Sequence, residues 1–102
     1  MRTVRVSKTF AAALDDLLAY GEPIYGSSIV ILKRAAVRAA LLRAAQHPRL
    51  KQPHIALGLV VYPVTATPFV VLYDFDDTEL RAHFIFHKNA CLEDLDPRSA
   101  EW

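Results

Sequence analysis

Hydrophobic residues recur with helical spacing in the first half of the chain. The first apolar run, at positions i, i+4, i+7 and i+8, consists of Phe10, Leu14, Leu17 and Leu18. Ser7 or Thr9 can cap this helix at its start. Pro23, which follows Gly21 and Glu22, is expected to end it, because proline lacks an amide hydrogen and disfavours helical geometry in the residue before it.

A second, longer helix is predicted from about Tyr25 to Gln46, where alanine, leucine and arginine predominate. His47 and Pro48 close it. Because the connection between the two helices is short, they should form an antiparallel hairpin. Apolar residues cover most of the circumference of the second helix. Its surplus apolar stripe is either covered by the rest of the domain or kept for a partner.

Strand-like patterns flank the helices. Short alternation predicts a strand at residues 4–6, and three further strands are predicted at 55–62, 69–75 and 80–87. Turns at 63–68 and 76–78 join the last three strands into an antiparallel meander. The alternation in the last strand places Arg81, His83 and His87 on one face. Residues 92–102 form an acidic extension, either a short helix or an ordered tail.

The order of these elements is β-α-α-β-β-β. This order predicts an α+β domain in which a helical hairpin packs on one face of a mainly antiparallel four-stranded sheet. The length of 102 residues fits a single domain over residues 1–102.

Composition narrows the class of protein further. The lone cysteine, Cys91, excludes a disulfide within the monomer and a cysteine-based zinc site, and we expect it to be a small core residue. The N-terminus lacks the apolar region of a signal peptide, and no apolar run is long enough to span a membrane. We therefore expect a cytoplasmic protein without cofactor or metal.

Charge is segregated along the chain although the formal net charge is only +1. Between Glu22 and Asp74 there are six lysines and arginines and no acid, a net charge of +6. The last 29 residues carry eight acids against three bases, a net charge of −5. Such segregation can steer a charged partner. It is equally compatible with a basic helix that leans on an acidic tail.

The ordered set of local motifs resembles the RelE/ParE superfamily of toxins from type II toxin–antitoxin systems. The matching pieces are Asp16 to Tyr20, the helix closing on His47-Pro48, Gly58, the strand from Pro68 to Tyr73 and the final Ile85-Phe86-His87. The resemblance spans residues 4 to about 96. It implies the α+β fold described above and one of two activities. RelE-like members cut mRNA on the ribosome, whereas ParE-like members inhibit DNA gyrase without a hydrolytic site.

A RelE-like nuclease would need a base, an acid and cations around the reacting phosphate. The resemblance places these roles in the loop before the second strand, late in that strand and after the last strand. The loop offers Lys51, but Leu59 to Tyr62 contain no arginine, and the segment from His87 to Asp94 contains neither arginine nor tyrosine. The remaining candidates are Lys51, Arg81, His87 and Lys88.

A ParE-like toxin that acts by protein–protein contact, with DNA gyrase as target by family analogy, is therefore the favoured interpretation. Its partner would be a cognate, acidic antitoxin attracted by Arg34, Arg38 and Arg43. The alternatives are a RelE-like, metal-free mRNA interferase and a non-toxic family member that binds or dimerises. With a pI of 7.9, the chain is not expected to bind nucleic acid by itself, whereas a homodimer is compatible with the sequence.

Overall fold

The computed structural model describes residues 2–54 and 56–102. Two helices and four strands follow in the predicted order. They are β1 (Thr3–Val6), α1 (Lys8–Tyr25), α2 (Ser27–Gln46), β2 (Val60–Pro63), β3 (Phe69–Phe75) and β4 (Glu79–His87). None of the described helices is long and apolar enough to cross a bilayer.

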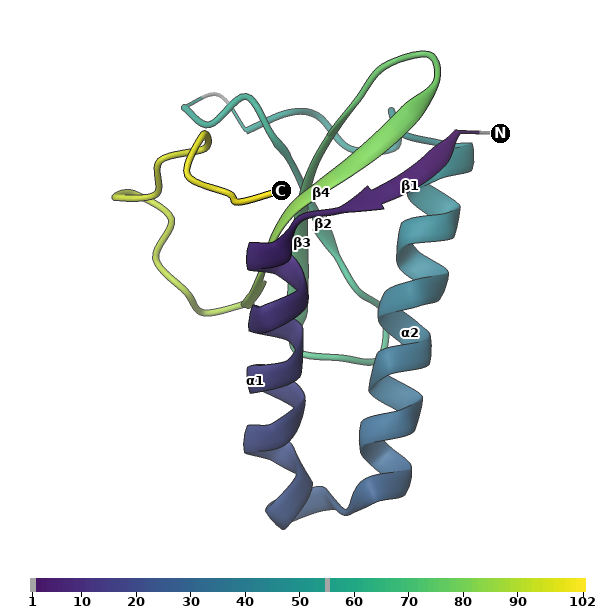
Figure 1. Ribbon diagram of the computed structural model, residues 1–102, viewed down its shortest axis with the longest axis vertical. Helices are drawn as coiled ribbons and strands as arrows, with labels where there is room; N and C mark the ends of the chain where they lie inside the picture. Colours follow the sequence, from purple (N-terminus) through teal and green to yellow (C-terminus); the bar gives the residue numbers. More distant parts are fainter. Residues whose placement is uncertain (1, 55) are drawn as a thin grey trace.

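The four strands form one sheet in the order β1-β4-β3-β2. β1 runs parallel to β4, and the other two pairs are antiparallel. The two helices lie side by side and antiparallel (Figure 1), and their buried residues pack with those of the sheet in one core cluster. The predicted α+β architecture is confirmed. β1 and β2 are the edge strands.

Helix α1 starts where the sequence indicates and ends later than predicted. The Ser7 hydroxyl accepts a hydrogen bond from the Phe10 amide at 2.8 Å, which caps the helix. The predicted stop at Pro23 is wrong, because α1 continues through this residue to Tyr25. A proline near the C-terminal end removes one helical hydrogen bond and does not by itself end the helix. The reversal of the chain between α1 and α2 requires a residue with a positive φ. Gly26 supplies that reversal with a φ of 83°.

The second predicted strand is wrong in its first half. Strand pairing begins at Val60, and Ile55 lies outside the described residues. Between them the chain turns, since Gly58 has a φ of 69° and its amide donates to the His54 carbonyl at 2.8 Å. Leu57 is nevertheless buried at the turn. The apolar run therefore reflects a buried turn as well as a strand.

A β-bulge in β4 changes the predicted alternation. Leu72 pairs with Phe84 but Tyr73 pairs with Ala82, so His83 is the extra residue. Beyond the bulge the faces are exchanged, and His87 lies opposite Phe69, a residue of the helix-side core. The prediction that His87 shares a face with Arg81 is therefore wrong.

The second face of the sheet is covered by residues 92–102. Leu92, Leu95 and Ala100 pack against a small core of Leu57, Leu59, Leu72 and Phe84. This segment is ordered but not helical, and the Glu101 carbonyl accepts a hydrogen bond from the Lys8 amide at 2.6 Å. Cys91, expected in the core, is exposed. The helices and this segment thus enclose the sheet from opposite faces.

Candidate docking site

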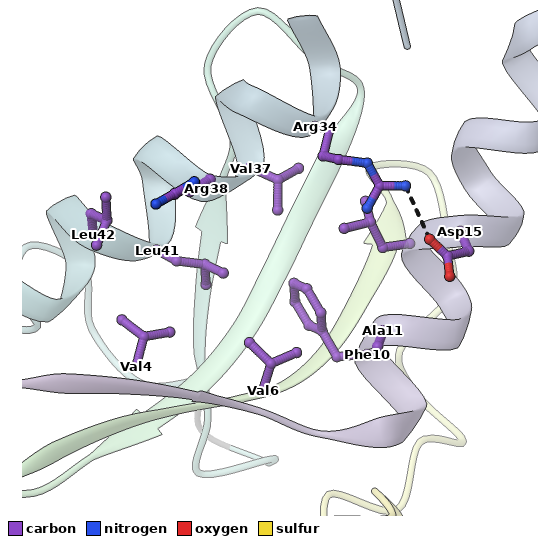
Figure 2. A pocket seen from close by; sticks show the side chains of 11 residues that line it. Val4, Val6, Phe10, Ala11, Asp15, Arg34, Val37, Arg38, Leu41 and Leu42 are labelled. Carbon is purple, nitrogen blue, oxygen red and sulfur yellow. Dashed lines mark hydrogen bonds and ion pairs between the residues drawn. The ribbon is translucent and has the colours of Figure 1, made fainter. Parts of the chain in front are cut away.

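An apolar groove of 430 Å³ lies where β1, α1 and α2 meet. We call it the docking groove. It is lined by Val4, Val6, Phe10, Ala11, Leu14, Asp15, Arg34, Val37, Arg38, Leu41 and Leu42. Figure 2 shows the valines of β1 on one side and the α2 side chains on the other, with Phe10 between them. Apolar side chains thus make up most of the lining, and the charged ones all come from the helices.

The groove follows from the alternation in β1 and the stripes on the helices. Val4 and Val6 are two residues apart and share a face, while Phe10 and Val37, each 1% exposed, come from the buried stripes of α1 and α2. Val6 and Leu42 at the rim are each 40% exposed. Apolar surface left open and concave in this way is typical of a site for a protein partner.

The open backbone edge of β1 borders the same groove. The Thr3 amide donates to the carbonyl of Thr78, just before β4, and the Ser7 amide to that of Ala82 within β4, at 3.1 Å in each case. In a parallel pair, alternate residues direct both backbone groups to the same neighbour. The amides and carbonyls of Val4 and Val6 consequently point to the free side of the strand. This edge is open to pairing with an added strand.

Two arginines of α2 flank the groove. Arg34 pairs with Asp15 of α1 at 3.0 Å, an exposed ion pair of the kind that contributes little to stability. Within the described residues the Arg38 side chain makes no hydrogen bond or ion pair. The rim therefore carries a net positive charge beside an apolar floor, and this favours an amphipathic, acidic partner.

Arg43, predicted to act with Arg34 and Arg38, lies elsewhere. Five residues after Arg38, it points about 140° further around the helix. It lines two other hollows, together with Tyr62 and Thr65. The structure thus brings Arg34 and Arg38 together and separates Arg43 from them.

The candidate nuclease residue Arg81 is surrounded by carboxylates. Its guanidinium lies 2.8 Å from Asp74, 2.9 Å from Asp76 and 2.9 Å from Glu79. Hydrogen bonds to Asp74, then Glu79 and Asp76, raise the pKa of Arg81. Its charge is fixed but already neutralised by neighbours, so a phosphate would have to displace them.

The other nuclease candidates lie apart from Arg81. His87 is exposed and its Nδ1 accepts a hydrogen bond from the Asn89 amide at 3.2 Å, with the exposed Lys88 beside it. His87 follows Arg81 by six residues on β4, which at strand spacing is roughly 20 Å. Lys51 lines hollows in front of β2 together with residues of the loop. Arg81 and His87 are thus not brought together.

Sequence reasoning predicted an apolar docking stripe on the second helix beside Arg34 and Arg38, but it missed that β1 forms one wall of the groove. The alternation of Val4 and Val6 indicated a buried face, but only the strand order shows that β1 is an edge. The hollow that unites Arg43, Lys51 and Tyr62 was also missed, because no spacing signal links a helix end, a loop and a strand. The one hint of this hollow in the sequence is that Arg43 and Lys51 have no acidic residue near them in the chain.

Comparison with known proteins identifies the fold. No protein-family model and no curated protein matches the sequence. Among solved structures, the chain is similar to one described as "Chromosomal ParDE TA system from P. aeruginosa". The TM-score is 0.75 at 15% sequence identity, and the match covers 85% of this chain and 96% of that one. The chain therefore has the fold of a protein from a ParDE toxin–antitoxin system.

Proposed function

We propose that this protein is the ParE-like toxin of a type II toxin–antitoxin module and acts by protein–protein contact. The observation that carries the proposal is the docking groove, in which an apolar floor, a basic rim and an open strand edge adjoin. A cognate antitoxin would neutralise the toxin there. DNA gyrase is proposed as the cellular target by analogy with the ParE branch.

The groove specifies what the antitoxin should look like. Its apolar lining suits one face of an amphipathic helix, with side chains at i, i+3 or i+4 and i+7 as anchors. An extended segment can add to the free edge of β1, where the backbone groups of Val4 and Val6 point away from β4. Acidic residues beside these anchors would lie near Arg34 and Arg38.

The placement of the basic residues weighs against the RelE-like alternative. Arg81 would have to leave three carboxylates before it could bind a phosphate. His87 stands at the far end of β4, on the opposite face of the sheet from Arg81. A transition state for RNA cleavage needs its base and cations within hydrogen-bond reach of one phosphate.

Two assays run side by side test the proposed activity. The purified protein should inhibit DNA supercoiling by gyrase and should leave mRNA intact in a translation-coupled cleavage assay. The product of an adjacent antitoxin-like reading frame should restore supercoiling. Codon-dependent mRNA cleavage without any effect on gyrase would contradict the proposal and favour the interferase.

A matched pair of variants tests the groove. Ala11 and Ala12 are adjacent, exposed residues of α1, but only Ala11 lines the groove. Ala11→Lys should weaken antitoxin binding by at least about tenfold, because a charge would be forced against an apolar partner face. Ala12→Lys should leave the affinity within about twofold. Titration calorimetry measures both, and equal effects of the two variants would exclude the groove as the site.

A further inference from the structure

A second, basic hollow of 550 Å³ lies between the end of α2, the following loop and β2. We call it the basic hollow. It is lined by Arg43, Leu50, Lys51, Tyr62, Pro63 and Thr65. The lining offers a guanidinium, an ammonium and two hydroxyls, and no carboxylate. Every polar side chain in it can donate a hydrogen bond, so its chemistry suits an anion.

Both cations of the basic hollow are without partners in the part of the chain that the structure describes. Within residues 2–54 and 56–102, neither Arg43 nor Lys51 makes a side-chain hydrogen bond, an ion pair or a contact with a ring. Arg81, by contrast, is paired with three carboxylates. The hydrogen-bonding capacity of Arg43 and Lys51 is therefore available to a ligand.

The loop that carries Lys51 is anchored to the sheet. The buried Tyr73 hydroxyl donates to the Pro48 carbonyl at 2.7 Å. Burial, followed by the nearby Tyr62, raises the pKa of Tyr73 to about 12, so this hydroxyl keeps its proton. Arg49 lies over the Phe75 ring at 5.1 Å, and Pro53 bridges to Val60. The loop cations are thus held in place along β2.

A neighbouring hollow extends the charged strip. It has a volume of 240 Å³ and is lined by Arg49, Lys51, Gln52, Pro53, Val60 and Phe75. Lys51 lines both hollows, so Arg43, Lys51 and Arg49 follow one another along the same side of the molecule. Several cations in succession match a ligand with repeated negative charges.

We infer that the basic hollow and the strip beside it bind the phosphate groups of a nucleic-acid backbone. Phosphate oxygens can accept bonds from the guanidinium fork of Arg43, from Lys51 and from the hydroxyls of Tyr62 and Thr65 together. The docking groove differs, because its cations flank an apolar floor suited to a protein. The inference is independent of the proposed toxin activity, since it uses neither Arg34 and Arg38 nor the edge of β1.

Backbone binding of this kind should be sequence-independent and sensitive to salt. Three phosphate contacts predict a slope of about −2 to −3 for the logarithm of the association constant against the logarithm of the salt concentration. Single-stranded DNA and RNA of the same sequence should bind within about threefold of each other, because both present the same phosphates.

Fluorescence anisotropy of labelled oligomers of about 20 nucleotides at low salt tests the inference. Arg43→Gln/Lys51→Gln should weaken binding by at least about tenfold. Arg34→Gln/Arg38→Gln is the matched control, because it also removes two positive charges, but from the side of α2 that borders the docking groove. It should change nucleic-acid binding by less than about twofold. Tyr62→Phe, which keeps the ring, should weaken binding by about threefold.

Three outcomes would overturn the inference. The first is no binding of either oligomer by the wild-type protein at low salt. The second is an equal loss in both double variants, which would indicate attraction by overall charge. The third is equally tight, equally Arg43- and Lys51-dependent binding of polyglutamate or inorganic phosphate, which would identify an acidic protein or a free anion as the ligand. Circular dichroism melting checks that the variants remain folded.

Discussion

Tyr73 connects the core to the surface loop that precedes β2. Its ring is fully buried in the helix-side core, and its hydroxyl donates to the Pro48 carbonyl at 2.7 Å. A buried phenol of this kind is stable only when its hydroxyl has a partner. This hydrogen bond therefore ties the start of the loop that follows α2 to the core.

Removal of this hydroxyl should destabilise the protein measurably. Tyr73→Phe is expected to lower the free energy of unfolding by about 1 to 2 kcal/mol, because the buried Pro48 carbonyl loses its partner. Urea denaturation measures the change. Tyr20→Phe, at a residue 80% exposed, is the control and should have an effect below about 0.5 kcal/mol. Equal stabilities of the two variants would contradict the anchoring role.

Asp76 organises the turn between β3 and β4. Its carboxylate accepts hydrogen bonds from the amides of Thr78 and Glu79 at 2.8 and 2.9 Å, and Arg81 lies beside it. These two backbone amides, and then Arg81, lower the pKa of Asp76 below its ordinary value of 3.8. The carboxylate therefore stabilises the turn when it is ionised.

The lowered pKa of Asp76 predicts an acid-sensitive turn. Because the folded state holds this carboxylate ionised more strongly than the unfolded state, the stabilisation is present above pH 3.8 and is lost as the pH falls below it. Asp76→Asn should be less stable than wild type at neutral pH, and the difference should shrink in acid. Urea denaturation at neutral pH and below pH 3.8 measures the free energy of unfolding of both proteins. Asp77→Asn, one residue away, should retain the acid profile of the wild type.

At the level of elements, the hairpin of α1 and α2 depends on one residue. Gly26 alone joins the two helices and has a φ of 83°, a conformation that residues with a side chain rarely adopt. The tip around it is solvent-exposed and apolar, with Tyr20, Ile24, Tyr25, Ile31 and Leu32 more than half exposed. The tip is thus held together by backbone geometry more than by burial.

Two glycine-to-alanine variants of the hairpin should have effects of opposite sign. Gly26→Ala should destabilise the protein by about 1 kcal/mol, since alanine is strained at this φ. Gly21→Ala should stabilise it by up to about 1 kcal/mol, because Gly21 is helical and an added methyl would meet Tyr25 at 3.6 Å, an ordinary contact. Thermal unfolding measures both. Destabilisation by Gly21→Ala would show that the helices cannot accept the methyl.

Periodicity predicted the elements that bury one regular face. The stripe from Phe10 to Leu18 and the apolar, β-branched run from Phe69 to Phe75 could be recognised from local sequence alone. The exceptions depend on contacts between distant residues. The bulge at His83 arises from pairing with Leu72 and Tyr73, and the turn at Gly58 buries Leu57 against the opposite face of the sheet. Neither constraint is visible in a local pattern.

At the level of the molecule, the acid-free stretch between Glu22 and Asp74 divides into two surfaces. Arg34 and Arg38 border the docking groove, whereas Arg43 and Lys51 line the basic hollow on another side of α2. The sequence predicted one basic surface, because spacing along a helix does not by itself show which neighbours cover each side. The segregation of charge along the sequence is real, but it did not show that the basic residues lie on two separate surfaces.

The two double variants should separate the two surfaces. Arg34→Gln/Arg38→Gln should slow antitoxin association by about tenfold at low salt and by less at high salt, because steering by exposed charges is screened. Arg43→Gln/Lys51→Gln should change that rate by less than about threefold. Stopped-flow mixing with the antitoxin measures the rates. An equal slowing by Arg34→Gln/Arg38→Gln at low and at high salt would contradict electrostatic steering at the groove rim.

The parallel pairing of β1 with β4 also has a consequence for synthesis on the ribosome. Thr3 pairs with Glu79, and the Ser7 hydroxyl donates to the His83 carbonyl, so the first strand finds its place only after the last strand has left the ribosome. Contacts this distant in sequence form late and slow folding. The docking groove uses β1 as one wall and is therefore completed only after β4 has been made. A nascent chain can therefore bind a partner in this groove only after β4 has emerged from the ribosome.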